Sequence, residues 1–182
     1  MSRETLMAEL AAYQPMDARE RAMVDDVLQF VRAHEDCFER ALAIGHITAS
    51  AWIVDEAGTH ALLTHHRKLD RWLQLGGHAD GDPDVRRVAL REATEESGLT
   101  AIRFAHSSIY DVDVHVIPVR GDEPEHKHYD VRFAFVAPSG APLVVSVESH
   151  ELAWRPIAEL DRNGVDASVR RMARKTDALL GR

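Results

Sequence analysis

The stretch that decides the fold reads Arg91-Glu92-Ala93-Thr94-Glu95-Glu96-Ser97-Gly98-Leu99. It ends a helix that we predict to begin at Pro83, because Asp82 followed by proline is typical of a helix start and Gly98 of a helix end. At about 100° per residue, one stripe of that helix carries four residues: Val85, Ala89, Glu92 and Glu96. The apolar face of the helix therefore becomes a carboxylate face in its last two turns.

These glutamates lie where helix propensity alone would not place them. The helix dipole disfavours anionic side chains in the last turn by about 0.3 to 1 kcal/mol, and glutamates three or four residues apart repel each other. One interpretation is an acidic patch in solvent, as glutamate runs on helices usually are. However, a solvent-facing side is already supplied by Arg86, Arg87, Thr94 and Ser97. We therefore favour a divalent cation held by converging carboxylate oxygens.

Outward from this helix, the sequence predicts one mixed α/β unit. The spacing of apolar residues predicts an amphipathic helix over 17–34, capped by Asp17, with a shorter helix before it and another over 166–180. Short runs that favour extended structure predict strands over 47–54, 61–64, 102–104, 109–119, 128–136 and 143–147. No repeat or linker divides the chain, so we assign residues 1–182 to one domain.

Length and composition agree with this assignment. The chain has 182 residues, 45% of them hydrophobic, and its 22 Lys+Arg against 30 Asp+Glu give a net charge of −8. Negative charge argues against a nucleic-acid polymer as partner, because such binding requires Lys and Arg to neutralise phosphates. No run approaches the roughly 18 apolar residues that a membrane helix requires. We therefore expect a cytoplasmic protein without membrane contact, and the single cysteine, Cys37, fits a reducing compartment.

Together with Gly77, the quoted stretch resembles the Nudix box, G-x5-E-x7-R-E-U-x-E-E-x-G-U, over Gly77 to Leu99. Every defined position matches except one, since Pro83 stands where the first glutamate of the motif is expected. The surrounding sequence is similar to the family as well. Trp72-Leu73-Gln74-Leu75-Gly76-Gly77 leads into the box, and Glu148-Ser149-His150-Glu151 with Trp154 follows it.

The resemblance implies a Nudix-type α/β/α sandwich around a mixed β-sheet. Its core would span residues 45–160, with a helical extension over 1–44 and a C-terminal helix over 161–182. The resemblance also implies a metal-dependent hydrolase that cleaves the pyrophosphate bond of a nucleoside diphosphate linked to another moiety. The expected partner is this small nucleotide-type diphosphate, and a homodimer is an assembly that the family resemblance allows.

The resemblance further implies roles for residues of the box. Glu92, Glu95, Glu96 and the backbone carbonyl of Gly77 would bind the metal, Mg²⁺ or Mn²⁺, and Arg91 would orient the glutamates. Hard oxygen ligands suit these ions, which neutralise phosphoryl oxygens and lower the pKa of bound water.

The general base is expected to be a carboxylate. In this family it comes either from the box or from a later loop. The candidates here are Glu92 in the box and Glu148 or Glu151 in the loop before Trp154. Of these we favour Glu148.

The departure from the motif at Pro83 leaves carboxylates nearby, because Asp82 and Asp84 flank it. Two interpretations are open for these aspartates. Either Asp80 and Asp82 contribute to the metal environment, or Asp82 serves only as a turn and N-cap residue. We favour the second interpretation for Asp82.

The chain has 11 histidines, which is many for its length, and His78 directly follows the glycine that opens the box. By strand alternation, His128 and Asp130 project away from Tyr129 and Val131. This polar face is either the solvated side of an antiparallel sheet or a surface that contacts substrate or metal. We predict that His78, His128 and Asp130 contact the substrate.

Two other functions are compared with hydrolysis. Isopentenyl diphosphate isomerase shares the Nudix fold and carries Cys-Gly-His at the turn where this chain has Gly76-Gly77-His78. The single thiol of this chain, Cys37, lies in the N-terminal helical region instead, so the isomerase mechanism lacks its cysteine. A Nudix-like binding or regulatory module without catalysis is the other alternative, and the intact glutamates of the box argue against it. Turnover of a nucleotide panel with Mg²⁺ distinguishes an enzyme from such a module.

Overall fold

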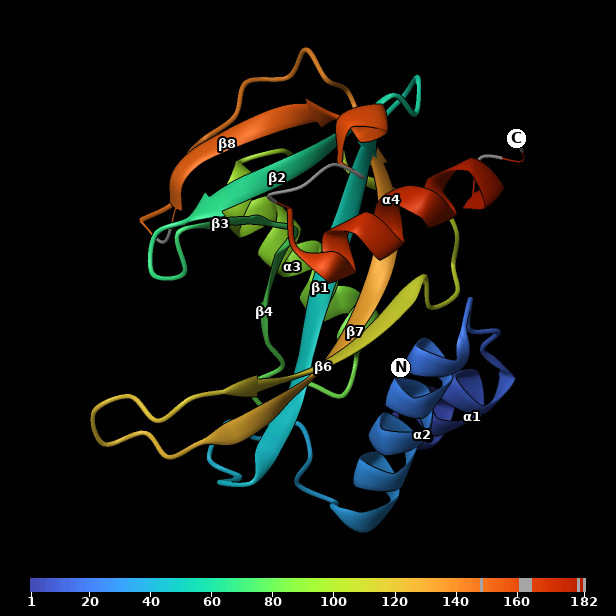
Figure 1. Ribbon diagram of the computed structural model, residues 1–182, viewed down its shortest axis with the longest axis vertical. Helices are drawn as coiled ribbons and strands as arrows, with labels where there is room; N and C mark the ends of the chain where they lie inside the picture. Colours follow the sequence, from blue (N-terminus) through green and yellow to red (C-terminus); the bar gives the residue numbers. More distant parts are fainter. Residues whose placement is uncertain (148, 161–164, 180, 182) are drawn as a thin grey trace.

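Strand β1 (Gly45–Asp55) lies at the centre of a mixed sheet in the computed structural model, which describes residues 1–147, 149–160, 165–179 and 181 (Figure 1). Along its whole length β1 pairs in parallel with β7 (His126–Ala137). Every residue of β1 is buried. Such burial is typical of a strand that is covered on both faces, and it explains the nearly continuous apolar run that predicted this strand.

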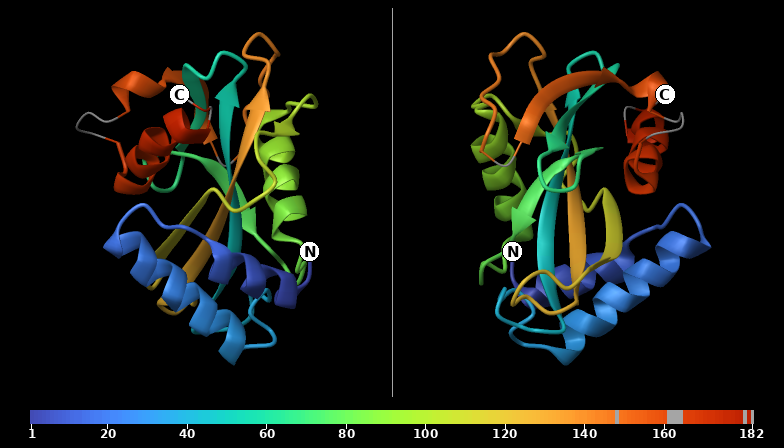
Figure 2. Two further views of the ribbon diagram at one scale, coloured as in Figure 1. Left: turned by 90° about the vertical axis from the view of Figure 1, so that its right-hand side faces the viewer. Right: turned by 60° about the vertical axis from the view of Figure 1, so that its left-hand side comes forward.

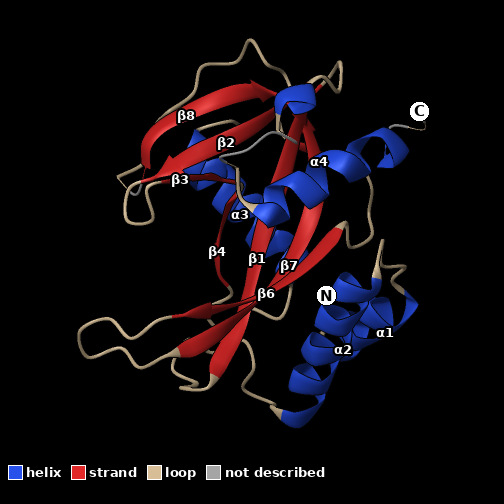
Figure 3. Cartoon of the chain, in the orientation of Figure 1, coloured by secondary structure: helices blue, strands red, loops and turns tan. Residues whose placement is uncertain are grey.

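The other strands extend the sheet on both sides of the β1–β7 pair, and Figure 3 shows their arrangement. On the side of β1 lie β2 (His60–His66), β3 (Arg71–Leu73), β4 (Leu75–His78) and β8 (Ser149–Pro156), which the short helix η1 (Ile157–Glu159) follows. On the side of β7 lie β5 (Arg103–Phe104) and β6 (Asp111–Ile117). The strand β2 pairs with β1 only near their shared turn, and β4 takes over the edge of β1 at residues 48–51. This exchange brings the segment before the box to the centre of the sheet.

Helices cover both faces of the sheet (Figure 2). On one face α3 (Val85–Ser97) packs its apolar side against Ile47 and Phe133. On the other face α4 (Ala167–Leu179) packs against Trp52. Alternation along β1 separates the two cores, since odd-numbered residues from 47 to 53 join the first and residues 52 and 54 join the second. The predicted α/β/α sandwich around a mixed sheet is confirmed.

The two N-terminal helices, α1 (Arg3–Ala12) and α2 (Ala18–Ala33), join the same core as α3. Asp17 caps α2 as predicted, because its side chain accepts a hydrogen bond from the Glu20 amide at 2.8 Å. None of the helices in the described ranges is both long and apolar enough to cross a membrane. Phe30 of α2 stacks on Tyr129 of β7 with 3.9 Å between ring centroids, and this contact attaches the helical pair to the sheet.

The polar face of β6 and β7 is exposed at His115 but buried at Asp111, His126, Asp130 and Arg132. Asp111 and Arg132 are 0% and 2% exposed, and they form an ion pair at 3.2 Å. Lys175 of α4 donates to Asp111 at 2.5 Å and also to Glu20 of α2. The interpretation of this face as the wet side of a sheet is wrong for its buried residues, because α4 supplies Lys175 and Arg171, whose charges pair with the carboxylate of Asp111.

Helix α3 begins two residues later than predicted. Its N-cap is Asp84, whose side chain accepts from the Arg87 amide at 3.3 Å. Asp82 instead accepts from the Asp84 amide at 2.9 Å and pairs with the Arg87 guanidinium at 2.7 Å, so it is a turn residue. Pro83 lies in this turn. The predicted helix end is confirmed, because Gly98 has the left-handed φ of 71° that favours glycine.

The strand predicted over 143–147 is wrong, since these residues form a loop. Val144 donates its amide to the carbonyl of Ser97 at the end of α3, at 2.8 Å, and Val147 is 89% exposed. High β propensity does not form a strand without a neighbouring strand to pair with. The actual strand, β8, begins at Ser149 and pairs with β2.

Candidate active site

The acidic face predicted from the sequence lies on the C-terminal half of α3, beside β4. Glu92 and Glu96 are partly buried and Glu95 is exposed. The Oε1 atom of Glu96 accepts a hydrogen bond from the Gly76 amide at 3.1 Å. The carboxylate of Glu92 lies directly against Gly77. The fold therefore brings two of the box glutamates to the two glycines that precede the box helix.

Arg91 holds Glu92 in this position. Its Nη2 atom donates to Oε1 of Glu92 at 2.7 Å and to the backbone carbonyl of His78 at 3.0 Å. A guanidinium stays charged throughout the working pH range, so the donor in this contact is always available. One side chain thus connects α3 with β4 and orients a carboxylate, which is the geometry that the predicted positioning role of Arg91 requires.

Neither Gly76 nor Gly77 leaves room for a side chain. A Cβ added at Gly77 would lie 2.5 Å from Oε2 of Glu92 and 2.6 Å from its Cδ. A Cβ added at Gly76 would lie 2.2 Å from Oγ of Ser50 and 2.7 Å from its Cα. The neighbour at Gly77 is the end of a flexible side chain, whereas the neighbour at Gly76 includes the backbone of β1.

This difference predicts that alanine at Gly77 lowers activity, whereas alanine at Gly76 lowers stability. Gly77→Ala is expected to lower kcat by about tenfold or more at nearly unchanged stability, because the methyl group displaces only the carboxylate of Glu92. Gly76→Ala is expected to cost about 1 to 3 kcal/mol of unfolding free energy, because the backbone of Ser50 must move. Thermal unfolding and turnover of both variants check this pair. An equal loss of stability in the two variants would contradict it.

The donor set of the acidic face fits a hard divalent cation. Three carboxylates and the backbone carbonyl of Gly77 offer only oxygen, which is the ligand that Mg²⁺ and Mn²⁺ prefer. Within the described ranges, the oxygens of Glu92, Glu95 and Glu96 do not all lie within 4.8 Å of one another. Like charges on one helix face repel each other, and a bound cation would offset that repulsion.

Of the two loop candidates for the general base, Glu148 lies outside the described residues. Glu151 is an exposed residue of β8, opposite His65 of β2. His65 in turn stacks on Trp72, with 5.2 Å between ring centroids. Glu92 is the candidate whose place at the acidic face is described. The choice among the three carboxylates stays a prediction.

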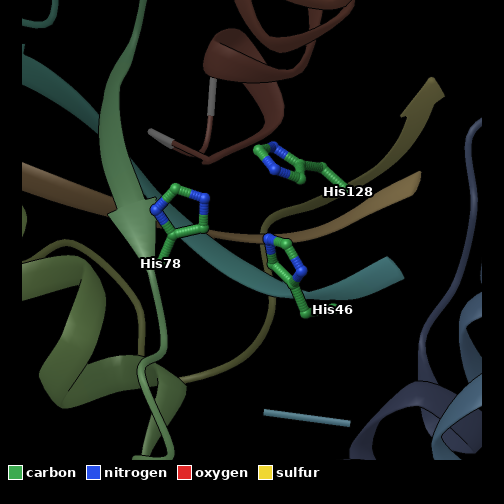
Figure 4. Close-up of side chains that lie close together, drawn as sticks. All are labelled: His46, His78 and His128. Atoms are coloured by element: carbon green, nitrogen blue, oxygen red, sulfur yellow. The ribbon is translucent and has the colours of Figure 1, made fainter. Parts of the chain in front are cut away.

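Three histidines gather where three strands lie side by side (Figure 4). His46 of β1, His78 of β4 and His128 of β7 have ligand atoms that all lie within 4.8 Å of one another. The parallel register of β1 and β7 places His46 directly beside His128. His46 was not predicted as a site residue, because only the strand register shows that these two distant residues are neighbours. Its alternation with Thr48 and Ser50 along β1 was the available signal.

Asp130 lies in a buried polar network. It is 2% exposed, and its carboxylate accepts hydrogen bonds from Ser50 at 2.9 Å, from Thr48 at 3.1 Å and from Arg132 at 2.7 Å. These contacts connect the central strands β1 and β7 through their side chains. Contact of Asp130 and His128 with substrate stays a prediction.

The single cysteine is not placed for chemistry. Cys37 is fully buried, and burial raises the pKa of its thiol to about 11. Its backbone carbonyl accepts from the Ile47 amide at the start of β1. A protonated thiol in the core does not supply the cysteine that an isomerase of the isopentenyl diphosphate type carries beside its Gly-His pair.

A cavity of about 450 Å³ opens between α4 and α1 with the segment that follows α1. Its walls come from α1, α4 and the loop before β6, and they include Tyr13, His106 and Tyr110. No glutamate of the box lines this cavity, so it is separate from the candidate active site.

Several solved structures are similar to this fold. A C. elegans Ap4A hydrolase in a binary complex is 19% identical and superposes with a TM-score of 0.60 over 74% of this chain and 97% of that chain. The MutT protein from Methanosarcina mazei Go1 is 19% identical, with a TM-score of 0.56 over 78% and 99% of the two chains. The E. coli dihydroneopterin triphosphate pyrophosphohydrolase is 13% identical, with a TM-score of 0.55 over 75% and 96%. At these identities the similarities show a shared fold.

The family comparison goes further than the fold. No curated protein matches the sequence. The family model described as NUDIX domain matches residues 45–175, which is well over half of the chain and includes the whole box. The match also contains the acidic face of α3, the glycines of β4 and the histidines of β1, β4 and β7. The chain therefore belongs to the Nudix family of hydrolases.

Proposed function

We propose that this Nudix hydrolase cleaves the pyrophosphate bond of a nucleoside diphosphate linked to another moiety, with Mg²⁺ or Mn²⁺ as cofactor. Family membership supports a pyrophosphohydrolase in general. The observation that carries the proposal is the arrangement of α3 against β4, in which Glu96 accepts from the Gly76 amide and Glu92 lies against Gly77.

The residues proposed to hold the ion are Glu92, Glu95, Glu96 and the carbonyl of Gly77. When bound, the ion neutralises phosphoryl oxygens and lowers the pKa of an attacking water. The chain itself positions the carboxylates. Arg91 fixes Glu92 through a 2.7 Å hydrogen bond, and the Gly76 amide fixes Glu96 at 3.1 Å. Such orientation before substrate arrives reduces the reorganisation that the reaction requires.

We predict that the loop before Trp154 supplies the general base. Glu148→Gln is expected to lower kcat by about 100-fold or more, with little change in metal affinity, because hydroxide formation needs a proton acceptor. Glu151→Gln tests the other loop candidate, which is a neighbouring exposed carboxylate of β8, and is expected to have the smaller effect. Kinetics and metal titration of both variants check this. Full activity of Glu148→Gln, together with a Glu92→Gln variant that binds metal but has lost kcat, would place the base in the box.

The experiment that tests the proposed function is a substrate panel with Mg²⁺. It contains dinucleoside polyphosphates and pterin triphosphates, which the similar Ap4A hydrolase and dihydroneopterin triphosphate pyrophosphohydrolase support. Nucleoside triphosphates and nucleotide sugars complete the panel. Release of phosphate or of a nucleoside monophosphate is the readout. Saturable binding of a panel member without turnover would favour a regulatory module instead.

The proposed partner is this small substrate. The net charge of −8 supports a small ligand neutralised by a metal rather than a nucleic-acid polymer. We propose the cytoplasm as the compartment, because the single cysteine is a buried free thiol. A homodimer stays a prediction.

A further inference from the structure

The three histidines of Figure 4 belong to three neighbouring strands and point toward a common centre. The ring centroid of His46 lies 5.0 Å from that of His78 and 4.8 Å from that of His128. The ligand atoms of all three rings lie within 4.8 Å of one another. Among the residues that the structure describes, no other group of three or more metal-ligating side chains meets this criterion. The backbone of a central sheet holds these rings, so their spacing does not depend on loops.

The buried polar atoms of this cluster lack hydrogen-bond partners. His46 is 2% exposed, and neither its Nδ1 nor its Nε2 atom has a hydrogen-bond partner in the described structure. The Nε2 atom of His128 is likewise buried without a hydrogen-bond partner in the described structure. Buried polar groups are satisfied in nearly all native proteins, and an exception calls for a ligand, an ion or a water. These atoms therefore indicate that something else occupies the centre of the cluster.

The chemistry of the cluster favours a cation over an anion. Burial disfavours the charged form of an imidazole, and a neutral ring keeps a lone pair on one nitrogen. The unpartnered nitrogens of His46 and the Nε2 atom of His128 can supply such lone pairs to a cation. A fourth ring, that of His126, lies 5.1 Å from His46 and donates from Nδ1 to the Pro124 carbonyl at 2.9 Å. Such a hydrogen bond leaves its Nε2 atom as the acceptor. The centre is thus surrounded by imidazole nitrogens.

We propose that His46, His78 and His128 form a second metal site, which takes a divalent transition metal of the zinc class. Three imidazole nitrogens with a fourth position open to water or to an anionic oxygen are a common zinc donor set, whereas Mg²⁺ prefers oxygen ligands. The site is distinct from the acidic face of α3. A Cβ at Gly77 would meet Glu92, while the next residue of β4, His78, faces the other side of the strand, toward His46.

The test is Zn²⁺ binding to the full chain after removal of metal with a chelator. Calorimetric titration is done in excess Mg²⁺, which occupies carboxylate sites, and without substrate. We expect one Zn²⁺ per chain, a higher melting temperature with Zn²⁺, and visible absorption bands when Co²⁺ replaces Zn²⁺. His46→Ala and His128→Ala are each expected to weaken Zn²⁺ binding by more than about 100-fold, since even loss of an outer-shell contact costs 10- to 100-fold.

Two control variants show where the ion binds. His106→Ala removes an exposed histidine outside the cluster, and Glu96→Gln alters the acidic face. Both should keep tight Zn²⁺ binding, and circular dichroism shows which variants are folded. If His46→Ala is unfolded, His128→Ala and the Co²⁺ spectrum of the unaltered chain carry the test.

Three results would overturn the proposal. They are no tight Zn²⁺ site in the unaltered chain, equal Zn²⁺ affinity in a folded His128→Ala variant, and loss of the site in Glu96→Gln. A His128→Ala variant that changes substrate preference at unchanged Zn²⁺ affinity would likewise assign the cluster to substrate contact. Because metal binding is measured without substrate, this test is independent of whether the proposed hydrolase activity is found.

Discussion

Replacing Glu96 with glutamine is expected to lower turnover by at least about 100-fold, which is the scale of losing one essential charge-stabilising group at a transition state. Glu96 is the acidic residue that the Gly76 amide orients at 3.1 Å. Glutamine keeps an oxygen that accepts this hydrogen bond but lacks the negative charge that a divalent cation requires. Steady-state kinetics on a substrate from the panel, at several Mg²⁺ concentrations, measure the loss.

Stability of the same variant separates a catalytic from a structural effect. Glu96→Gln removes one negative charge from the last turns of α3, where the helix dipole and the neighbouring glutamates disfavour it. Its melting temperature in EDTA should therefore equal or exceed that of the unaltered chain. Glu56→Gln, in the exposed turn between β1 and β2, is the control and should keep full activity. Full activity of Glu96→Gln would refute the assignment of the acidic face.

The second large effect concerns the buried ion pairs. Asp111→Asn is expected to lower the free energy of unfolding by about 3 to 5 kcal/mol, because it leaves buried cations without their shared anion. Asp111 is 0% exposed and accepts from Arg171 at 2.8 Å, from Lys175 at 2.5 Å and from Arg132 at 3.2 Å. Urea unfolding at pH 7 measures this loss.

An exposed ion pair is the matched control. Asp26 of α2 pairs with Lys127 of β7 at 2.9 Å, and their side chains are 39% and 41% exposed. Asp26→Asn also breaks a contact between a helix and the sheet, yet exposed pairs contribute only about 0 to 1 kcal/mol. Equal losses from Asp111→Asn and Asp26→Asn would contradict the stabilising role of the buried pairs.

Acid is expected to destabilise the fold by protonating Asp111. Burial by itself would raise the pKa of Asp111, but the hydrogen bond from Arg171 and the charges of Arg132 and Lys175 outweigh burial and hold the pKa below its ordinary value of 3.8. A lowered pKa in the folded state stabilises the fold above pH 3.8, and this contribution is lost as the pH falls toward the folded-state pKa. The unfolding free energy of Asp111→Asn should therefore vary less with pH below 3.8 than that of the unaltered chain.

The helices were predictable because each carries its own signals. Asp17 caps α2 and Gly98 ends α3 as predicted, since a cap depends on residues within one turn of the chain. The start of α3 was misplaced because Asp82 and Asp84 are both suitable caps, and only the folded turn decides between them. The strands β3 and β4 have three and four residues, too few for alternation to reveal them.

The sequence by itself determined the family, the acidic face of α3 and the residue types of its chemistry, because the box is contiguous and helical spacing converts it directly into one surface. Only the tertiary structure decided what the polar sides of β1, β6 and β7 contact. Strand register and the docking of α4 joined Asp111 to Lys175 and His46 to His128, pairs that lie far apart in the chain. Local sequence does not predict such pairing, because alternation assigns a side chain to one face of the sheet but not to a partner on a neighbouring strand or helix.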